Sequence, residues 1–203
     1  MIALAAAAAC GCNCSCSSAP PAEGPATGVR EDRPAEWAQP VERPGLPNLH
    51  KVSDALYRGA APEDEGWAEL KAMGIRTVVN LQSFHSDRAE TGEHGLGYEH
   101  ITMKAWHAEY KEFVRFLSIV SDPANQPVFV HCMHGADRTG AMCAAYRVAV
   151  QGWTPEEAVR ELRDGGYGFH DVWQNLLDDL HEMDWEQLAA DAGLAPRESE
   201  AAE

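Results

Sequence analysis

One ten-residue run constrains this chain more than any other part of its sequence. The apolar segment PVFV leads into HCMHGADRTG, which begins at His131, and a helix-forming stretch starts at Arg138. A loop that joins a buried strand to the start of a helix directs several backbone N–H groups at one point. Such a loop binds anions and stabilises a thiolate in the same place. The run therefore predicts an anion-binding loop built around Cys132.

The residue types in this loop suit the chemistry of phosphate esters. Backbone amides and the forked guanidinium of Arg138 can hold the non-bridging oxygens of a bound phosphate. The sulfur of Cys132 then lies behind the phosphorus, in position for in-line attack. Gly135 is interpreted as the residue whose missing side chain permits a tight backbone curl. The predicted substrate-binding residues are those of the loop itself: Met133, His134, Gly135, Ala136, Asp137 and Arg138.

The same residues resemble a known signature. Cys132 and Arg138 with five residues between them, His131 before them and Thr139 after them resemble the loop of protein tyrosine and dual-specificity phosphatases. The run from residue 50 to 82, HKVSDALYRGAAPEDEGWAELKAMGIRTVVNLQ, is similar to the opening of bacterial and atypical dual-specificity phosphatases. The resemblance implies a cysteine-phosphatase fold over about residues 49–183. It also implies that Cys132 forms a phosphocysteine, Arg138 binds phosphate, Thr139 supports the thiolate and His131 orients the loop.

The proton donor for the leaving group is left open by the sequence. In most relatives an Asp on a loop roughly thirty residues before the cysteine does this work, but here that region reads MKAWHAEYKEF and contains no Asp. Asp137 is the first candidate because it is tied to the loop of the nucleophile, and a helix N-cap or an ion-pair role is the alternative interpretation. His107 and Glu109 are the other candidate acids.

The order of predicted elements defines the fold class. A helix with Trp67 and Leu70 at helical spacing precedes a β-branched strand over 75–81, and an amphipathic helix over 108–122 precedes the strand before Cys132. Thr154 with Glu157 three residues later predicts a capping box. Strands that alternate with helices, followed by helices only, predict an α/β domain with a single central mixed or parallel sheet flanked by helices. His85, Asp87 and Arg88 are interpreted as residues of a solvated loop, with a place at the edge of the pocket as the alternative. Cys143 is interpreted as a small buried residue, with a resolving thiol as the alternative.

The ends of the chain differ in composition from its centre. Residues 1–16 contain a short apolar run that ends at Cys10, which indicates an export or lipoprotein signal and a possible membrane tether through that cysteine. No Lys or Arg precedes the run, so a late start or a low-complexity segment in a cytoplasmic protein is the alternative. Residues 17–48 are expected to form a disordered linker, residues 49–183 the phosphatase domain and residues 184–203 an acidic tail.

Charge and ligand patterns narrow the possible partners. The chain has 32 acidic and 16 basic residues and a net charge of −16, which argues against nucleic acid as a partner. No metal-ligand spacing is found, no cofactor is expected, and the chain is expected to be a monomer. The expected substrate is a phosphorylated protein or a small phosphoester, and a phosphoinositide or inositol phosphate is the alternative. Ala136 adds no charge to the loop, which favours monoesters of low charge over inositol phosphates. A catalytically weak phosphate-binding pseudophosphatase and a sulfur-transfer or arsenate-reducing enzyme are the rival classes.

Overall fold

A mixed sheet of six strands lies at the centre of the computed structural model, which describes residues 33–195. The first three strands pair antiparallel, whereas the remaining neighbours pair parallel. In spatial order the strands are β1 (Gln39–Pro40), β2 (His50–Lys51), β3 (Leu56–Gly59), β6 (Val128–His131), β4 (Thr77–Asn80) and β5 (Gly97–His100). This sheet confirms the predicted α/β fold with one mixed sheet.

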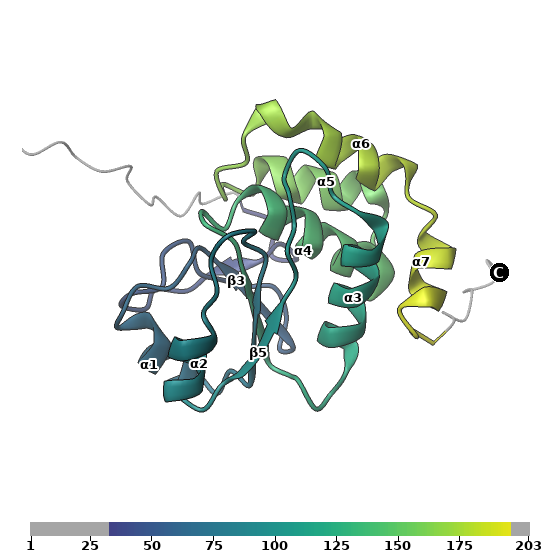
Figure 1. Cartoon of the computed structure of the whole chain (residues 1–203). Coiled ribbons are helices and arrows are strands. Elements are labelled where there is room, and N and C mark those ends of the chain that lie inside the picture. The colour runs from purple at the N-terminus through teal and green to yellow at the C-terminus, as the bar shows by residue number, and fades with distance from the viewer. Residues whose placement is uncertain (1–32, 196–203) are drawn as a thin grey trace, which may run out of the picture. The chain divides into compact units, whose positions relative to one another are not determined.

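Helices cover both faces of this sheet (Figure 1). Helices α1 (Gly66–Ala72) and α2 (Arg88–Glu93) lie on one side. The other side carries α3 (Tyr110–Ser121), α4 (Asp137–Ala149), α5 (Pro155–Asp164), the short 3-10 helix η1 (Asp171–Trp173), α6 (Gln174–Glu182) and α7 (Trp185–Asp191). Helix α4 follows β6 directly and contacts α3, α5, α6 and α7.

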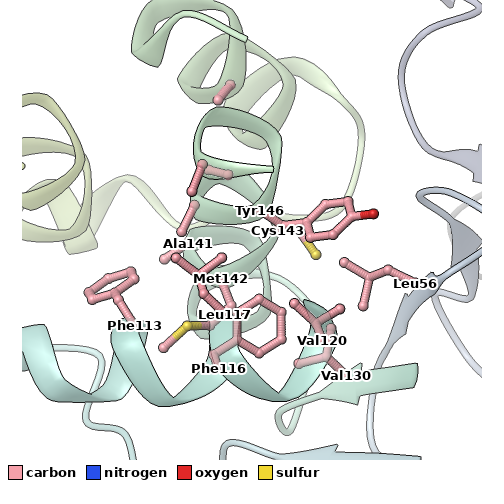
Figure 2. Close-up of a cluster of buried hydrophobic side chains, with 14 of the residues drawn as sticks. Leu56, Phe113, Phe116, Leu117, Val120, Val130, Ala141, Met142, Cys143 and Tyr146 are labelled. Atoms are coloured by element: carbon pink, nitrogen blue, oxygen red, sulfur yellow. The ribbon is translucent and has the colours of Figure 1, made fainter. Parts of the chain in front are cut away.

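Successive side chains of a strand point to opposite faces of the sheet. In the central strands both sets of side chains are buried, because helices cover both faces. Val78 and Phe129 pack into the cluster that contains Trp67 of α1, whereas Val79 and Val130 pack into the cluster beneath α3 and α4. This second cluster is the larger of the two. Its centre is drawn in Figure 2 with residues of α3 and α4: Phe113, Phe116, Leu117, Val120, Ala141, Met142, Cys143 and Tyr146.

Cys143 belongs to this core and not to the surface. Its side chain lies among the apolar residues in Figure 2, and burial raises the pKa of its thiol to about 11. A thiol that stays protonated is a poor nucleophile, so the structure agrees with the interpretation of Cys143 as a small core residue.

The helix that follows the phosphate loop is buried along nearly its whole length. Every residue of α4 except Arg138 is buried. Close approach of α5 explains Gly140, because a Cβ atom at that position would lie 2.0 Å from Cδ1 of Leu162. Helix α5 begins at the predicted capping box, in which Glu157 N–H donates to Thr154 Oγ1 and Thr154 N–H donates to Glu157 Oε2. Burial of α4 therefore fixes the loop that leads into it.

Both ends of the domain lie outside the boundaries expected from the sequence. Residues 33–48 were expected to be linker, yet Ala38 and Leu46 are 1% and 4% exposed and pack in the core. Helix α7 lies in the expected acidic tail and buries Leu188 completely. A few apolar residues suffice in these segments because each contacts distant parts of the chain, as the bond from Ala38 N–H to Glu161 Oε1 shows. Composition averaged along the sequence does not reveal such contacts.

The segment after β4 and the N-terminal segment also differ from, or lie beyond, the expected organisation. Arg88 was expected to lie in a solvated loop, but it is the first residue of helix α2. The predicted export signal over residues 1–16, including Cys10, lies outside the described residues, as does the linker up to residue 32. Within residues 33–195, no helix is long and apolar enough to cross a membrane.

Candidate active site

The predicted phosphate loop runs from the end of β6 into the first turn of α4. Cys132 is 2% exposed, while the following Met133 is 56% exposed. Gly135 has a φ of +69°, and a Cβ atom there would lie 2.4 Å from the carbonyl carbon of Gly59. The loop therefore needs a glycine at this position both for its left-handed backbone and for its close approach to the end of β3.

Arg138 and Thr139 both have unused hydrogen-bonding capacity next to this loop. The Nη1 atom of Arg138 donates to the carbonyl oxygens of Leu81 and Met103 over 3.3 and 3.4 Å, which are long bonds for N–H to oxygen. The Oγ1 atom of Thr139 is buried and has no hydrogen-bond partner in the described part of the chain. Because buried hydroxyls nearly always have a partner, Thr139 is available to donate to a thiolate or a bound anion.

A buried carboxylate holds His131, the histidine that precedes Cys132. The Nε2 atom of His131 lies 2.8 Å from Oδ2 of Asp87, and its Nδ1 atom lies 3.2 Å from the carbonyl oxygen of Cys132. Asp87 is 1% exposed and also contacts Nε2 of His85 at 3.2 Å. The expectation that Asp87 is solvated is therefore wrong. Its carboxylate is buried, and its contact with His131 fixes the orientation of that ring.

Asp137 points toward a loop far away in the sequence. Its Oδ1 atom accepts the backbone N–H of His170 at 2.8 Å, and its Oδ2 atom lies 3.0 Å from Nδ1 of the same residue. Both carboxylate oxygens of Asp137 therefore face His170, and this contact fixes the orientation of the His170 imidazole.

The other candidate acids lie on the segment before α3. Glu109 forms the capping box of α3 with Glu112 and an ion pair with Lys111, and this partner lowers the pKa of the Glu109 carboxyl. His107 is exposed, and its backbone N–H donates to Lys104 O. Trp106 beside it is 60% exposed. We call residues 102–109 the exposed wall of the site.

A second group of residues ties the opposite side of the loop to the domain. Arg58 is 1% exposed, donates from Nη2 to Gly135 O at 2.7 Å, and stacks its guanidinium 3.7 Å from the ring centre of Tyr167. Asn48 donates from Nδ2 to both His134 O and Tyr167 O, at 3.0 and 2.9 Å. Asn48 has a φ of +56°, a conformation that Asn tolerates better than most residues. We call Asn48, Arg58 and residues 165–170 the clamped wall.

Four segments of the domain combine a large exposed apolar side chain with a nearby histidine. Three loops and the short helix η1 each expose one large apolar side chain: Phe84, Trp106 and Met133 in the loops and Val172 in η1. Each of these residues has a histidine within two positions: His85, His107, His134 and His170. Within residues 33–195, no cluster of three or more His, Cys, Asp or Glu side chains is arranged to hold a metal ion.

Comparison with known proteins assigns the family. The family model described as "DSP-PTPase phosphatase fused to NAD+ Kinase" matches residues 39–171. This match covers more than half of the chain, so the chain belongs to the DSP-PTPase family of the tyrosine and dual-specificity phosphatases. The predicted resemblance is thereby confirmed.

Individual relatives agree with this assignment. The dual specificity protein phosphatase TpbA of Pseudomonas aeruginosa is 34% identical over 143 residues, which cover 68% of this chain and 63% of TpbA. The inositol diphosphatase DSP5 of Arabidopsis thaliana is 26% identical over 127 residues, 58% of this chain and 61% of that protein. The matches thus span less than two thirds of these relatives.

Solved structures confirm the fold. The crystal structure of P. aeruginosa TpbA superposes with a TM-score of 0.70 at 31% identity, covering 78% of this chain and 98% of that structure. A TpbA variant in complex with pTyr gives a TM-score of 0.71 at 30% identity, with 80% and 99% covered. The catalytic domain of the PP-IP phosphatase Siw14 of S. cerevisiae, at 19% identity and a TM-score of 0.63, covers 73% of this chain and 92% of that structure and shares the fold.

Sequence reasoning missed three residues that the structure places beside the loop. Asn48 was assigned to the linker, Asp87 to a solvated loop, and His170 was not singled out. Each contacts the loop through a residue more than thirty positions away, as the spacings of 86, 44 and 33 residues show. The Gly-rich run GGYGFH over residues 165–170 is the sequence signal that could have marked His170, but only the fold reveals its partner Asp137.

Proposed function

We propose that this protein hydrolyses phosphate monoesters through a phosphocysteine on Cys132. The observation that carries the proposal is the buried Cys132 between β6 and the first turn of α4, in a loop closed by Gly135 against β3. Backbone amides at a helix start stabilise both the thiolate and the phosphate dianion. Family membership supports the same activity.

The other residues of the loop have separate roles in this proposal. Arg138 leaves its two long bonds to backbone carbonyls and forms a bidentate contact with the phosphate. Thr139 donates its unpartnered hydroxyl to the sulfur and so helps it depart when water attacks. His131 keeps the loop in its curled shape through its contacts with Asp87 and the Cys132 carbonyl.

The surroundings of the loop favour an aryl or otherwise apolar monoester of low charge. Trp106 and Met133 offer apolar contact area next to the loop, and Ala136 is 1% exposed and carries no charge. Highly anionic inositol phosphates require more permanent positive charge than this site offers. The pTyr bound in the TpbA complex is a ligand of the favoured kind, whereas inositol diphosphatases among the relatives represent the alternative.

Phosphate release from an aryl phosphate tests the proposal. Wild type is expected to turn over 4-nitrophenyl phosphate with a chelator present, and Cys132→Ser and Arg138→Ala are expected to lose this activity. Glu156→Gln, an exposed change on α5, is the matched control with unchanged activity. Activity that persists in Cys132→Ser would overturn the mechanism. Tight binding of phosphate or vanadate without turnover would instead identify a pseudophosphatase.

We further propose that the protein is exported as a monomer and is tethered through Cys10. The apolar run over residues 1–9 and the small residues before Cys10 support this assignment. A bacterial host fed a labelled fatty acid should label the wild type and not Cys10→Ser. An unlabelled wild type would contradict the tether, and a dimer in solution would contradict the monomer.

A further inference from the structure

We infer that His170 is the catalytic acid and base of this phosphatase, with Asp137 as its positioning partner. The inference rests on the proposed phosphatase function. It assigns the role that a loop Asp has in most relatives to a histidine on the opposite wall of the site. The juxtaposition of His170 with Asp137, the residue directly before Arg138, is the observation behind it.

The imidazole of His170 is oriented by this contact. The Nδ1 atom lies 3.1 and 3.0 Å from the two carboxylate oxygens of Asp137, and an ionised carboxylate can only accept a hydrogen bond. Nδ1–H therefore donates to Asp137. The opposite nitrogen, Nε2, is directed away from that carboxylate and is the atom that can exchange a proton. An Asp that fixes the tautomer of a catalytic histidine in this way is a recurring arrangement in enzymes.

The location of the ring also fits. His170 has 52% of its side chain exposed, while Asp137 has 10%. The ring centre of His170 lies 5.9 Å from that of His134, which belongs to the phosphate loop. A half-exposed imidazole beside the loop can reach both a bound ester and bulk water, as a group that returns its proton every turnover must.

The segment that carries His170 is held against the phosphate loop by further contacts. Asn48 joins Tyr167 O to His134 O, and Arg58 joins the Tyr167 ring to Gly135 O. Acid–base catalysis needs the donor within hydrogen-bond reach of the reacting oxygen. The clamped wall provides this fixed position, whereas the carboxylate of the exposed wall, Glu109, is committed to its capping box and to Lys111.

The proposed steps balance in atoms and charge. Cys132 thiolate attacks phosphorus, the S–P bond forms, the bond from phosphorus to the ester oxygen breaks, and Nε2–H of His170 gives its proton to that oxygen. Water then attacks phosphorus while the neutral Nε2 takes one proton from it. The S–P bond breaks, inorganic phosphate leaves, and both the thiolate and the protonated histidine are restored.

The test compares leaving groups in a set of variants of the full chain. We expect His170→Gln to lower kcat/KM for phenyl phosphate about 100-fold or more, because phenol needs a proton to leave. With 4-nitrophenyl phosphate the loss should be several-fold smaller, since 4-nitrophenolate leaves without one. The alkaline limb of the kcat/KM profile should disappear in His170→Gln, and added imidazole should restore phenyl phosphate turnover in His170→Gly. His181→Gln, an exposed histidine on α6, is the control that should behave as wild type.

Each alternative acid gives a different pattern. Equal losses for both esters in His170→Gln, without rescue by imidazole, would assign His170 a merely structural role and overturn the inference. Loss of leaving-group dependence in Asp137→Asn with His170→Gln unaffected would return the role to Asp137, and the same pattern in His107→Gln would assign it to His107. A failure of the phosphatase proposal is seen separately, as turnover of 4-nitrophenyl phosphate that survives in Cys132→Ser.

Discussion

The two walls beside the phosphate loop are built in opposite ways. The clamped wall is fixed by hydrogen bonds from Asn48 and Arg58 to the backbone of the loop and by the stacking of Arg58 on Tyr167, and the Arg58 bond is buried. The exposed wall presents Trp106 and His107 to solvent, and its Met103 carbonyl accepts a long bond from Arg138. The difference teaches that the clamped wall can hold a side chain in a fixed position, whereas the exposed wall leaves its side chains free to contact a ligand.

The largest effect on stability is expected from Glu161, whose carboxylate binds the hydroxyl of Tyr167 in the clamped wall. Its carboxylate accepts from Arg147, from the Tyr167 hydroxyl and from Ala38 N–H. Burial opposes its ionisation, but these donors outweigh burial and lower the pKa of the carboxyl. Glu161→Gln leaves Arg147 buried without its charge partner and should reduce the free energy of unfolding by about 3 to 5 kcal/mol. Chemical denaturation measures this loss, and a change as small as that of the surface control Glu156→Gln would contradict it.

The next largest effect is a pH dependence of the free energy of unfolding that arises from His50. The His50 ring packs edge-on against the Tyr167 ring. Burial lowers the pKa of His50 to about 4, and the nearby charges of Arg58 and Arg33 act in the same direction. The unfolded chain takes up this proton near pH 6.5, so the free energy of unfolding falls as pH drops from there toward 4. Between pH 7 and pH 5 the loss from this group should be about 2 kcal/mol.

His50→Gln is expected to remove this part of the pH dependence. Denaturation at the two pH values, compared with His181→Gln as control, measures the difference. An identical slope in wild type and His50→Gln would show that His50 does not titrate in this range.

A smaller loss is expected from Asn48. Asn48→Gly keeps the left-handed backbone but removes the bonds to His134 O and Tyr167 O, and should lower the free energy of unfolding by about 1 to 2 kcal/mol. kcat/KM should fall as well, because the two loops lose their link. Asn48→Ala should cost more than Asn48→Gly, since Ala adds strain at positive φ. If stability and kcat/KM both stayed at wild-type values, Asn48 would not hold the wall.

The smallest effect on stability is expected from Trp106 on the exposed wall. Trp106→Ala should change the free energy of unfolding by less than about 0.5 kcal/mol, as exposed residues usually do. It should lower kcat/KM for phosphotyrosine about 3- to 10-fold through the lost aromatic contact, but not for glycerol phosphate. Equal losses for both esters would remove Trp106 from substrate recognition.

The family and the central fold could be predicted because their signals are local. A short strand, a cysteine loop and a helix follow each other within residues 128–149, and alternating patterns predict the other strands and helices. The family and the mixed sheet were confirmed on this basis. The capping box at Thr154 could also be predicted from the sequence, because its two partners are three residues apart.

The rest of the site depends on contacts between distant residues. From the sequence alone, Asp137 is equally compatible with an acid, a helix cap or an ion-pair partner. Only the fold shows that His170 is its partner. Asp87 reads as a loop residue until β4 and β6 pair and place it against His131. Residues 33–48 read as linker because their few apolar side chains gain partners only in the folded domain.

The most direct test of the central claim is mass spectrometry of the acid-quenched enzyme during turnover of 4-nitrophenyl phosphate. The account predicts one phosphoryl group on the peptide that contains Cys132 in wild type, and more of it in His170→Gln, because His170 also takes the proton from the water that hydrolyses the intermediate. No such adduct should form in Cys132→Ser. A phosphoryl group on another residue, or full turnover in Cys132→Ser, would contradict the account.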